Sequence, residues 1–173
     1  MNSQQNQIVS ARVVRGHRVA SGLNENPRFP GGTLRMQIPH FRRLGFDISQ
    51  LYLGTLNVSI APLQYRVARP RCTFSNVKWH PTEPAEDFSF FDVRVLLPGG
   101  EMVDGFIYYP HPETKPEHFQ APDVLELLLP FLKGIKYGME LSLKIPAGQM
   151  TFAEQSIQPV QPAAAGTDKT LQA

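Results

Sequence analysis

Proline and glycine interrupt the whole chain and set the strongest limit on its fold. The 173 residues include 16 prolines and 13 glycines, more than the combined share of roughly 12% in an average protein. Because proline removes a backbone donor and glycine weakens a helix, long helices are disfavoured. Short strands joined by turns are favoured instead, and a helical bundle or a coiled coil is disfavoured.

Between the turns, apolar residues mostly alternate with polar ones, as in half-buried strands. The strands are predicted at residues 8–15, 33–38, 55–60, 71–79, 90–97, 102–109 and 141–145. Pro98-Gly99-Gly100 is a turn signal that predicts a hairpin from the fifth and sixth of these. A helix is predicted over residues 123–132 and a helical turn over 41–44. These predicted strands and helices together indicate a mainly β protein, a β-barrel with one or two helical insertions.

The composition indicates one folded domain with loose ends. Hydrophobic residues make up 42% of the chain, which is enough for a core. Residues 1–7 are polar, and residues 153–173 are rich in Gln, Ala, Pro and Thr. Such segments bury too little apolar surface to offset the entropy of ordering. We therefore predict a domain over residues 8–152 and disordered termini on both sides.

Charge and cysteine content argue against several classes of partner. The chain has 17 Lys and Arg against 15 Asp and Glu, a net charge of +2, so a nucleic-acid partner is not expected. Its longest apolar runs, such as residues 127–129, are far shorter than the ~20 residues of a membrane span. The single cysteine, Cys72, cannot form an intramolecular disulfide, and the first residues lack the pattern of a signal peptide. We expect a cytoplasmic protein without a membrane partner; its oligomeric state is open, and a monomer is compatible.

Thr55 and Asn57 form the first candidate site. Side chains two apart on a strand point to the same face, so a hydroxyl and an amide oxygen would lie side by side. Two neutral oxygens suit Mg²⁺ that arrives with phosphates and keeps several waters. The alternative is that Thr55 favours the strand and Asn57 ends a ladder, although asparagine is depleted in strands.

A loop that follows the first predicted strand is the second candidate. Residues 21–28 read Ser-Gly-Leu-Asn-Glu-Asn-Pro-Arg. Glycine and asparagine tolerate positive φ, so successive amides could line a concave anion site, and Arg28 could add a phosphate contact. An ordinary surface loop is the alternative.

Two acidic segments later in the chain, at residues 123–126 and at Asp104, can each be interpreted in two ways. Asp123 and Glu126 have the spacing of a capping box at the start of the predicted helix; the alternative is that Glu126 faces a pocket. Asp104, followed by Gly105, could mark a bulge or place a carboxylate at the rim of a barrel.

Taken in order, these segments resemble the CTP-dependent riboflavin kinases. The resemblance spans nearly all of the predicted domain. It rests on Ser21-Gly22-Leu23, Leu44-Gly45-Phe46, Gly54-Thr55-Leu56-Asn57-Val58, Asp104-Gly105-Phe106-Ile107, residues 123–130 and Tyr137-Gly138-Met139-Glu140-Leu141. It implies a small, closed, six-stranded cradle-loop β-barrel and the Mg²⁺-dependent transfer of a phosphoryl group from CTP to riboflavin, which forms FMN and CDP.

The resemblance also implies roles for individual residues. Thr55 and Asn57 would hold Mg²⁺, while Thr114 and Glu126 would contact the flavin. The residues implied in nucleotide binding are Gly22, Leu23, Asn24, Glu25, Asn26, Arg28 and Lys133. The resemblance identifies no general base, and Asp104 is the candidate that the sequence itself offers.

Two segments depart from the pattern of the family. Asn24 and Asn26 stand where the family has glycines, and Lys133-Gly134 stands where it has Leu-Arg. An asparagine side chain can obstruct a close approach to phosphate, and lysine does not replace a bidentate arginine. Two functions therefore remain open: a riboflavin kinase, or a non-catalytic barrel that binds flavin or nucleotide.

Overall fold

The described part of the chain is mainly β. A computed structural model describes residues 6–17, 25–115, 117 and 120–154. In chain order its elements are β1 (Asn6–Val13), α1 (Thr33–Arg43), β2 (Leu56–Ser59), β3 (Leu63–Val67), β4 (Cys72–Val77), β5 (Glu86–Leu96), β6 (Met102–Pro110), β7 (Val124–Leu128), β8 (Glu140–Pro146) and β9 (Met150–Glu154). The prediction of a mainly β protein is confirmed.

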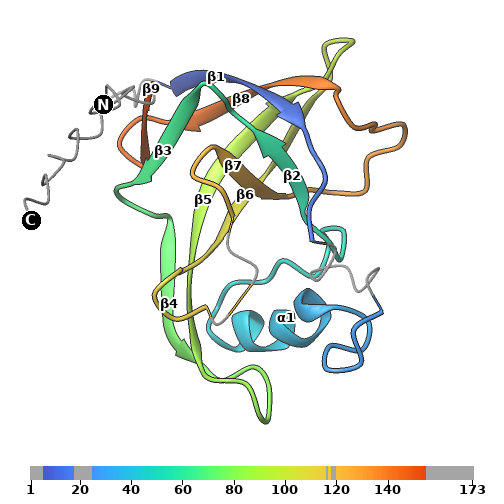
Figure 1. Ribbon diagram of the computed structural model, residues 1–173, viewed down its shortest axis with the longest axis vertical. Coiled ribbons are helices and arrows are strands. Elements are labelled where there is room, and N and C mark those ends of the chain that lie inside the picture. Colours follow the sequence, from blue (N-terminus) through green and yellow to red (C-terminus); the bar gives the residue numbers. More distant parts are fainter. Residues whose placement is uncertain (1–5, 18–24, 116, 118–119, 155–173) are drawn as a thin grey trace, which may run out of the picture.

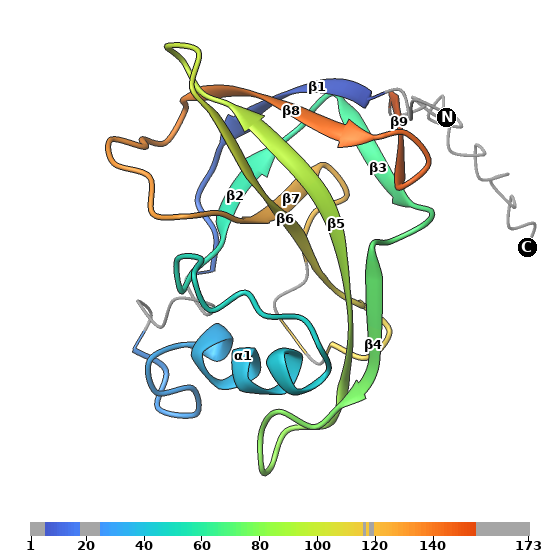
Figure 2. The same ribbon diagram turned by 180° about the vertical axis from the view of Figure 1, so that it is seen from behind.

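Seven strands pair in the order β4-β5-β6-β7-β2-β1-β8, while β3 and β9 form a separate two-stranded sheet. All pairs between these strands are antiparallel. β8 also pairs with β5, for example Ser142 with Leu96, so the pairings return to a strand already in the sheet. β5 and β6 form a long hairpin, and α1 lies across its lower end, away from β1 and β8 (Figures 1 and 2).

Alternation along the strands divides the apolar side chains between two cores. Ile107 of β6 and Leu127 of β7 belong to a core shared with β1, β2, β5 and β8. The next residues, Tyr108 and Leu128, belong to a second core that includes Leu34 and Phe41 of α1. The outer face of β6 and β7 is therefore covered by the helix.

The first correction concerns residues 33–38, predicted as a strand and found in α1. Leu34, Gln37 and Phe41 are its buried side chains, together with Thr33. These positions are three and four residues apart, as on one face of a helix. Because Gln37 is polar, the sequence does not show this helical spacing, and the remaining apolar residues alternate as in a strand. The predicted helical turn at residues 41–44 includes the end of this helix.

The second correction concerns residues 123–132, predicted as a helix. Residues 124–128 instead form β7, which pairs with β2 on one side and β6 on the other. Leucine and glutamate favour helices, but Leu125 and Leu128 are buried in different cores. The burial of residues 124–128 on both faces of the sheet contributes more than their preference for a helix. No capping box forms, and Asp123 accepts a hydrogen bond from Ser59 Oγ at 2.6 Å instead.

The remaining strands lie close to their predicted positions. β3 and β9 were not predicted, because both are short and weakly apolar. β1 begins at Asn6 and β9 ends at Glu154, so residues 6–7 and 153–154, predicted as disordered, are in strands. The rest of both predicted tails lies outside the described residues. Within the described ranges, no helix is long and apolar enough to cross a membrane.

Candidate functional site

A row of polar side chains crosses three neighbouring strands on the face that α1 covers. Asn57 of β2 lies opposite Glu126 of β7, and Glu126 lies opposite Tyr108 of β6. Directly opposed residues of antiparallel strands are about 5 Å apart. The register therefore brings together an amide, a carboxylate and a phenol that the sequence separates widely.

These three side chains are buried, and two of them are hydrogen-bonded to neighbouring glutamines. Asn57 is 6% exposed and Glu126 is 7% exposed. Gln120 Nε2 donates to Glu126 Oε1 at 2.5 Å, and Tyr108 Oη donates to Gln37 Oε1 of α1 at 2.8 Å. Among the described residues, the buried side-chain atom without a hydrogen-bond partner is Asn57 Nδ2. An unpaired buried donor needs a physical explanation, such as backbone strain, a bound water or a ligand that accepts its hydrogen bond.

Thr55 and Asn57 present neighbouring oxygens, as predicted. Thr55 Oγ1 lies 3.4 Å from Asn57 Oδ1. Two ligands at right angles around Mg²⁺, each at about 2.1 Å, are about 3.0 Å apart, so a small closure would let both oxygens bind one ion. Gly16 makes room for this arrangement, because a Cβ at that position would lie 2.5 Å from Asn57 Oδ1.

The donor set is therefore compatible with a hydrated Mg²⁺ that carries phosphates. Both oxygens are neutral, and Glu126 is the carboxylate directly across the strand from Asn57. Among the described residues, no group of three or more His, Cys, Asp or Glu side chains could hold a metal. The candidate metal ligands remain Thr55 and Asn57, on the ground of their two neighbouring oxygens.

The tyrosines around Glu126 are strongly desolvated. Burial, together with the nearby Glu126 carboxylate, raises the pKa of Tyr108 well above its usual value. Burial, with smaller contributions from Tyr109 and Glu126, raises the pKa of Tyr65 to about 12. Both phenols stay protonated at neutral pH and can act as hydrogen-bond donors.

Two cavities flank the row. One of about 90 Å³ lies beside Glu126, with Tyr65, Tyr108, Lys115 and Gln120 in its wall. Another of about 200 Å³ is lined by Thr55, Tyr52, Phe131, Leu132 and other residues. The Tyr52 and Phe131 rings lie 5.8 Å apart, and Phe131 is 73% exposed. An exposed pair of rings beside a candidate metal ligand provides a surface on which a planar ring could stack.

Only part of the predicted nucleotide loop can be described. Gly22, Leu23 and Asn24 lie outside the described residues. Glu25 is exposed and has a φ of 53°, a positive value that is uncommon for a non-glycine residue. Asn26 uses its side chain within the loop, because Asn26 Oδ1 accepts from the backbone N–H of Arg28 at 3.0 Å.

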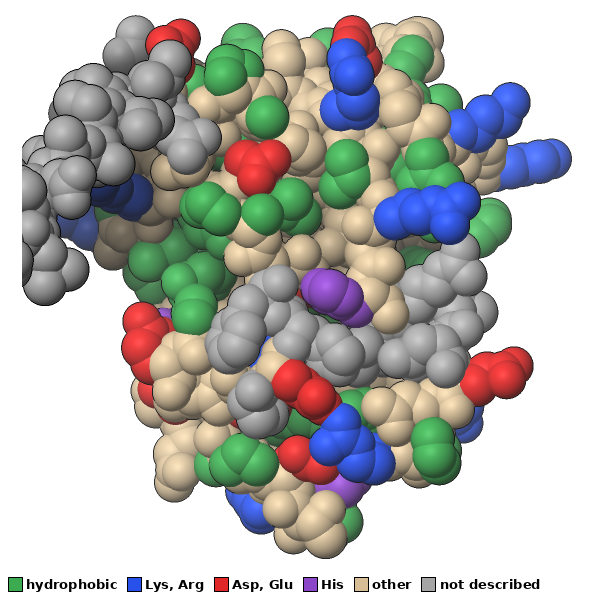
Figure 3. All heavy atoms as spheres, viewed as in Figure 1, with side chains coloured by type: hydrophobic (Ala, Val, Ile, Leu, Met, Phe, Trp, Pro, Cys, Tyr) green, Lys and Arg blue, Asp and Glu red, His purple; other side chains and the backbone are tan. Residues whose placement is uncertain are grey.

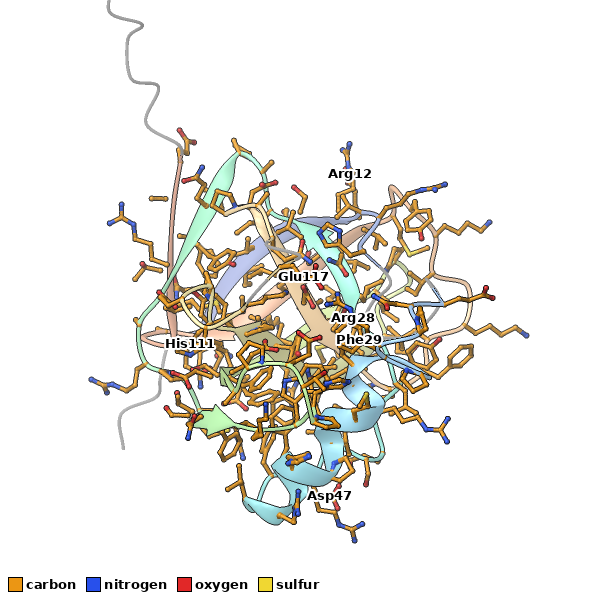
Figure 4. All side chains as sticks on the ribbon, turned by 60° about the horizontal axis from the view of Figure 1, so that its bottom comes forward. Arg12, Arg28, Phe29, Asp47, His111 and Glu117 are labelled. Carbon is orange, nitrogen blue, oxygen red and sulfur yellow. The ribbon has the colours of Figure 1, made fainter. Side chains whose placement is uncertain are left out.

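Arg28 is bound to carboxylates. Its guanidinium pairs with Glu83 at 3.2 Å and with Glu117. Figure 4 shows Arg28 beside Phe29 and close to Glu117. Figure 3 shows acidic and basic side chains close together on the lower part of the face that it draws. The site predicted for Arg28 would require phosphate to displace these carboxylates.

Three further predicted residues are not members of the polar row formed by Asn57, Glu126 and Tyr108. Thr114 Oγ1 donates to the backbone of His111 at 3.3 Å and accepts from the backbone N–H of Asp87 at 2.8 Å, and Thr114 is not among the residues that line the cavity beside Glu126. Lys133 is exposed in the loop between β7 and β8. Asp104 pairs with Arg94 at 2.5 Å on an exposed surface, and its hydrogen bond to Arg94 lowers its pKa. A low pKa is unfavourable for a general base.

The sequence did not identify Tyr108, Gln37 or Gln120 as members of the site. Each reaches it through tertiary packing, from β6, from α1 and from the loop that precedes β7. A buried glutamine in a helix is the one local signal, and it becomes visible only after the helix is assigned correctly.

Models of known protein families, curated proteins and solved structures were all compared with the chain, and none of them matches it.

Proposed function

We propose that the protein is a riboflavin kinase that transfers the terminal phosphoryl group of a nucleoside triphosphate, with CTP as the preferred donor, to riboflavin. The observation that carries the proposal is the pair of oxygens of Thr55 and Asn57, 3.4 Å apart, across the strand from the buried Glu126. These are the residues that the resemblance to CTP-dependent riboflavin kinases assigns to Mg²⁺ and flavin. The amide of Asn57 that lacks a partner supports a ligand at this position.

The fold that we propose for this activity is a closed six-stranded barrel of the cradle-loop type. The pairings β5-β6-β7-β2-β1-β8 and the return from β8 to β5 support it. In a closed barrel every strand is paired on both sides. The strands β2 and β7 could then not shift against each other, and the positions of Asn57 and Glu126 would be fixed. A rigid backbone of this kind suits phosphoryl transfer, which depends mainly on positioning and charge neutralisation.

In the reaction, the ribityl 5′-hydroxyl oxygen bonds to the γ-phosphorus as the bond from that phosphorus to the β–γ bridging oxygen breaks. The hydroxyl proton is released to water, and FMN and the nucleoside diphosphate are the products. When bound, Mg²⁺ would neutralise charge on the phosphates. Thr55 and Asn57 would hold the ion with their side-chain oxygens. Glu126 would accept a hydrogen bond from the flavin, and Gln120 would hold the carboxylate in place.

A barrel that binds flavin or nucleotide without catalysis is the second candidate. The ion pairs of Arg28 with Glu83 and Glu117 favour it, because a guanidinium shared by two carboxylates has lost much of its attraction for phosphate. Asn26 adds to this, since its side chain stabilises a turn in the same loop.

Incubation of the pure protein with riboflavin, Mg²⁺ and each of CTP, ATP, GTP and UTP separates the two functions. We expect FMN, detected by chromatography, with CTP as the best donor. Asn57→Ala should abolish FMN formation and retain riboflavin binding, measured by quenching of flavin fluorescence. Ser59→Ala on the same strand is the matched control and should retain activity.

The absence of FMN with all four nucleotides would reject the kinase. Riboflavin binding without nucleotide binding, measured by calorimetry, would support the non-catalytic alternative instead.

A further inference from the structure

The cavity beside Glu126 brings together several donors and acceptors that the proposed reaction does not use. We call it the Tyr65 cavity, and its volume is about 90 Å³. Ligands of the size of a drug occupy about 300–1,000 Å³, so only one edge of a large ring would enter it. Six polar side chains belong to its wall: Tyr65, Tyr108, Tyr109, Lys115, Gln120 and Glu126.

Glu126 supplies the acceptor of this cavity. The hydrogen bond from Gln120 uses Glu126 Oε1, which leaves Oε2 to accept from a ligand. Glu126 is 7% exposed, so little water competes for this oxygen. Hydrogen bonds to an ionised group are stronger than those between neutral groups, and a low local dielectric strengthens them further. The group that complements Oε2 is therefore an N–H or O–H of the ligand.

Tyr65 of β3 supplies a donor in the same wall. Burial, together with Tyr109 and Glu126, raises the pKa of Tyr65 to about 12, so the hydroxyl keeps its proton. No hydrogen bond to another described residue engages this hydroxyl. The Tyr65 ring packs edge-on against Tyr109, with 6.3 Å between the ring centroids, and this contact restrains the phenol. Tyr65 can therefore donate to a ligand in the cavity.

Lys115 adds a positive charge to the wall. Its backbone N–H donates to the carbonyl of His111 at 2.9 Å, which anchors the residue in the loop that precedes β7. Within the described ranges, Lys115 takes part in no ion pair. Its ammonium group is a donor without an acceptor function. The cavity thus combines one free carboxylate oxygen with donors, and it complements an edge on which an N–H stands between carbonyl groups.

We infer that the Tyr65 cavity binds the pyrimidinedione edge of the flavin ring, with N3–H donating to Glu126 Oε2 and a neighbouring ring carbonyl accepting from the Tyr65 hydroxyl. The inference rests on the proposed function and names the part of riboflavin that this cavity recognises. In the flavin, N3–H stands between the carbonyl groups at C2 and C4. The ribityl chain, which carries the reacting hydroxyl, starts from the central ring and would remain outside the cavity. Tyr65 is then a specificity-determining residue.

Cytosine is the competing occupant, because its amino group can also donate to a carboxylate. Thr55, the candidate metal ligand, lines the other cavity and not this one. A nucleotide whose metal ion is held by Thr55 is therefore expected on the side of that other cavity, and the flavin is the occupant that the Tyr65 cavity favours.

Riboflavin and 3-methylriboflavin, compared by quenching of flavin fluorescence without nucleotide, test the N3 contact. The methyl group removes the N–H, and the loss of a hydrogen bond to a charged group weakens binding by about tenfold or more. We expect that difference for wild type. Glu126→Ala should bind the two flavins within about twofold of each other, and Glu126→Gln, which keeps a neutral acceptor, should retain a preference of about threefold. Equal binding of the two flavins by wild type would overturn the inference.

Tyr65→Phe tests the second contact and keeps the ring that packs on Tyr109. It should weaken riboflavin binding by about threefold to tenfold, as expected for a hydrogen bond between neutral groups. Tyr137→Phe is the matched control, because Tyr137 is 54% exposed and does not line the cavity, and it should bind as wild type does. Sulfur is a weaker acceptor than oxygen, so the loss in Tyr65→Phe should be smaller with either 2-thioriboflavin or 4-thioriboflavin. The same loss with all three flavins would show that Tyr65 acts through packing alone and would refute its role.

Competition and FMN formation distinguish the failure of this inference from that of the proposed function. Cytidine should not displace riboflavin; displacement would assign the cavity to the base and overturn the inference. If wild type forms FMN but does not discriminate against 3-methylriboflavin, the inference is refuted and the kinase stands. If wild type discriminates between the two flavins but forms no FMN with any nucleotide, the kinase is refuted and the flavin contact stands. If riboflavin does not bind at all, both are refuted.

Discussion

Replacing Asn57 with leucine should make the protein more stable and inactive. Asn57 is 6% exposed, and its Nδ2 atom has no hydrogen-bond partner among the described residues. A buried donor without a partner costs about 1–3 kcal/mol. Leucine has a similar size and carries no polar atom, so Asn57→Leu removes this cost.

The interactions that Asn57→Leu removes contribute little to stability. The hydrogen bond from Thr55 Oγ1 to Asn57 Oδ1 is long, 3.4 Å, and at such a length it contributes at most about 0.5 kcal/mol. The leucine must also fit beside Gly16. We expect a net stabilisation of about 1 kcal/mol, which corresponds to a rise in Tm of about 2–4 °C for a chain of this size.

Thermal unfolding followed by circular dichroism measures the effect without nucleotide or Mg²⁺. Addition of CTP and Mg²⁺ should then raise the Tm of wild type but not of Asn57→Leu, because only a protein that binds the ligand is stabilised by it. A Tm for Asn57→Leu several degrees below that of wild type would refute the reasoning, since it would show that the amide has partners in the folded protein.

Asn57→Asp is the contrasting variant. It places a second carboxyl opposite Glu126, and both burial and the like charge raise the pKa of the introduced group above its value in the unfolded chain. A raised pKa gives stability that is present at low pH and lost as the pH rises through it. The variant should therefore be less stable than wild type, by more at pH 8 than at pH 5.

Three further predictions follow from single contacts. Gly105→Ala should destabilise the protein by about 1–3 kcal/mol or more in urea unfolding, because its Cβ would collide with the carbonyl of Leu128 and lie 2.5 Å from Leu129 Cδ2; unchanged stability would contradict that packing. Tyr65 should ionise near pH 12 in an absorbance titration, so its contribution to stability is complete below pH 10 and declines as the pH rises toward 12; Tyr65→Phe should remove this transition, and a titration near pH 10 would argue against its burial. Asp104→Ala should leave FMN formation intact and cost about 1 kcal/mol or less, because its pair with Arg94 is exposed; a large loss of activity would restore Asp104 as a candidate base.

The strands of the domain were largely readable from the sequence. Alternation over residues 55–60 and the turn at Pro98-Gly99-Gly100 predicted β2 and the β5–β6 hairpin. The reason is physical: a half-buried strand needs an alternating pattern, and a tight turn needs residues that adopt unusual backbone angles. The same alternation placed Thr55 and Asn57 on one face, and the structure keeps their oxygens 3.4 Å apart.

Two segments could not be assigned correctly from local signals. Gln37 occupies a buried helical position because Tyr108 donates to it, and residues 124–128 form a strand because they lie between β2 and β6. In both cases a partner distant in sequence decided the outcome, and tertiary burial contributes more free energy than local propensity.

The sequence by itself therefore determined a mainly β chain and the pair Thr55 and Asn57. The tertiary structure decided what surrounds that pair. It placed Glu126 opposite Asn57 by strand register, and elsewhere it paired Arg28 with two glutamates. Spacing along one strand is fixed by covalent geometry, whereas the register between strands and the choice of ionic partners depend on the whole fold.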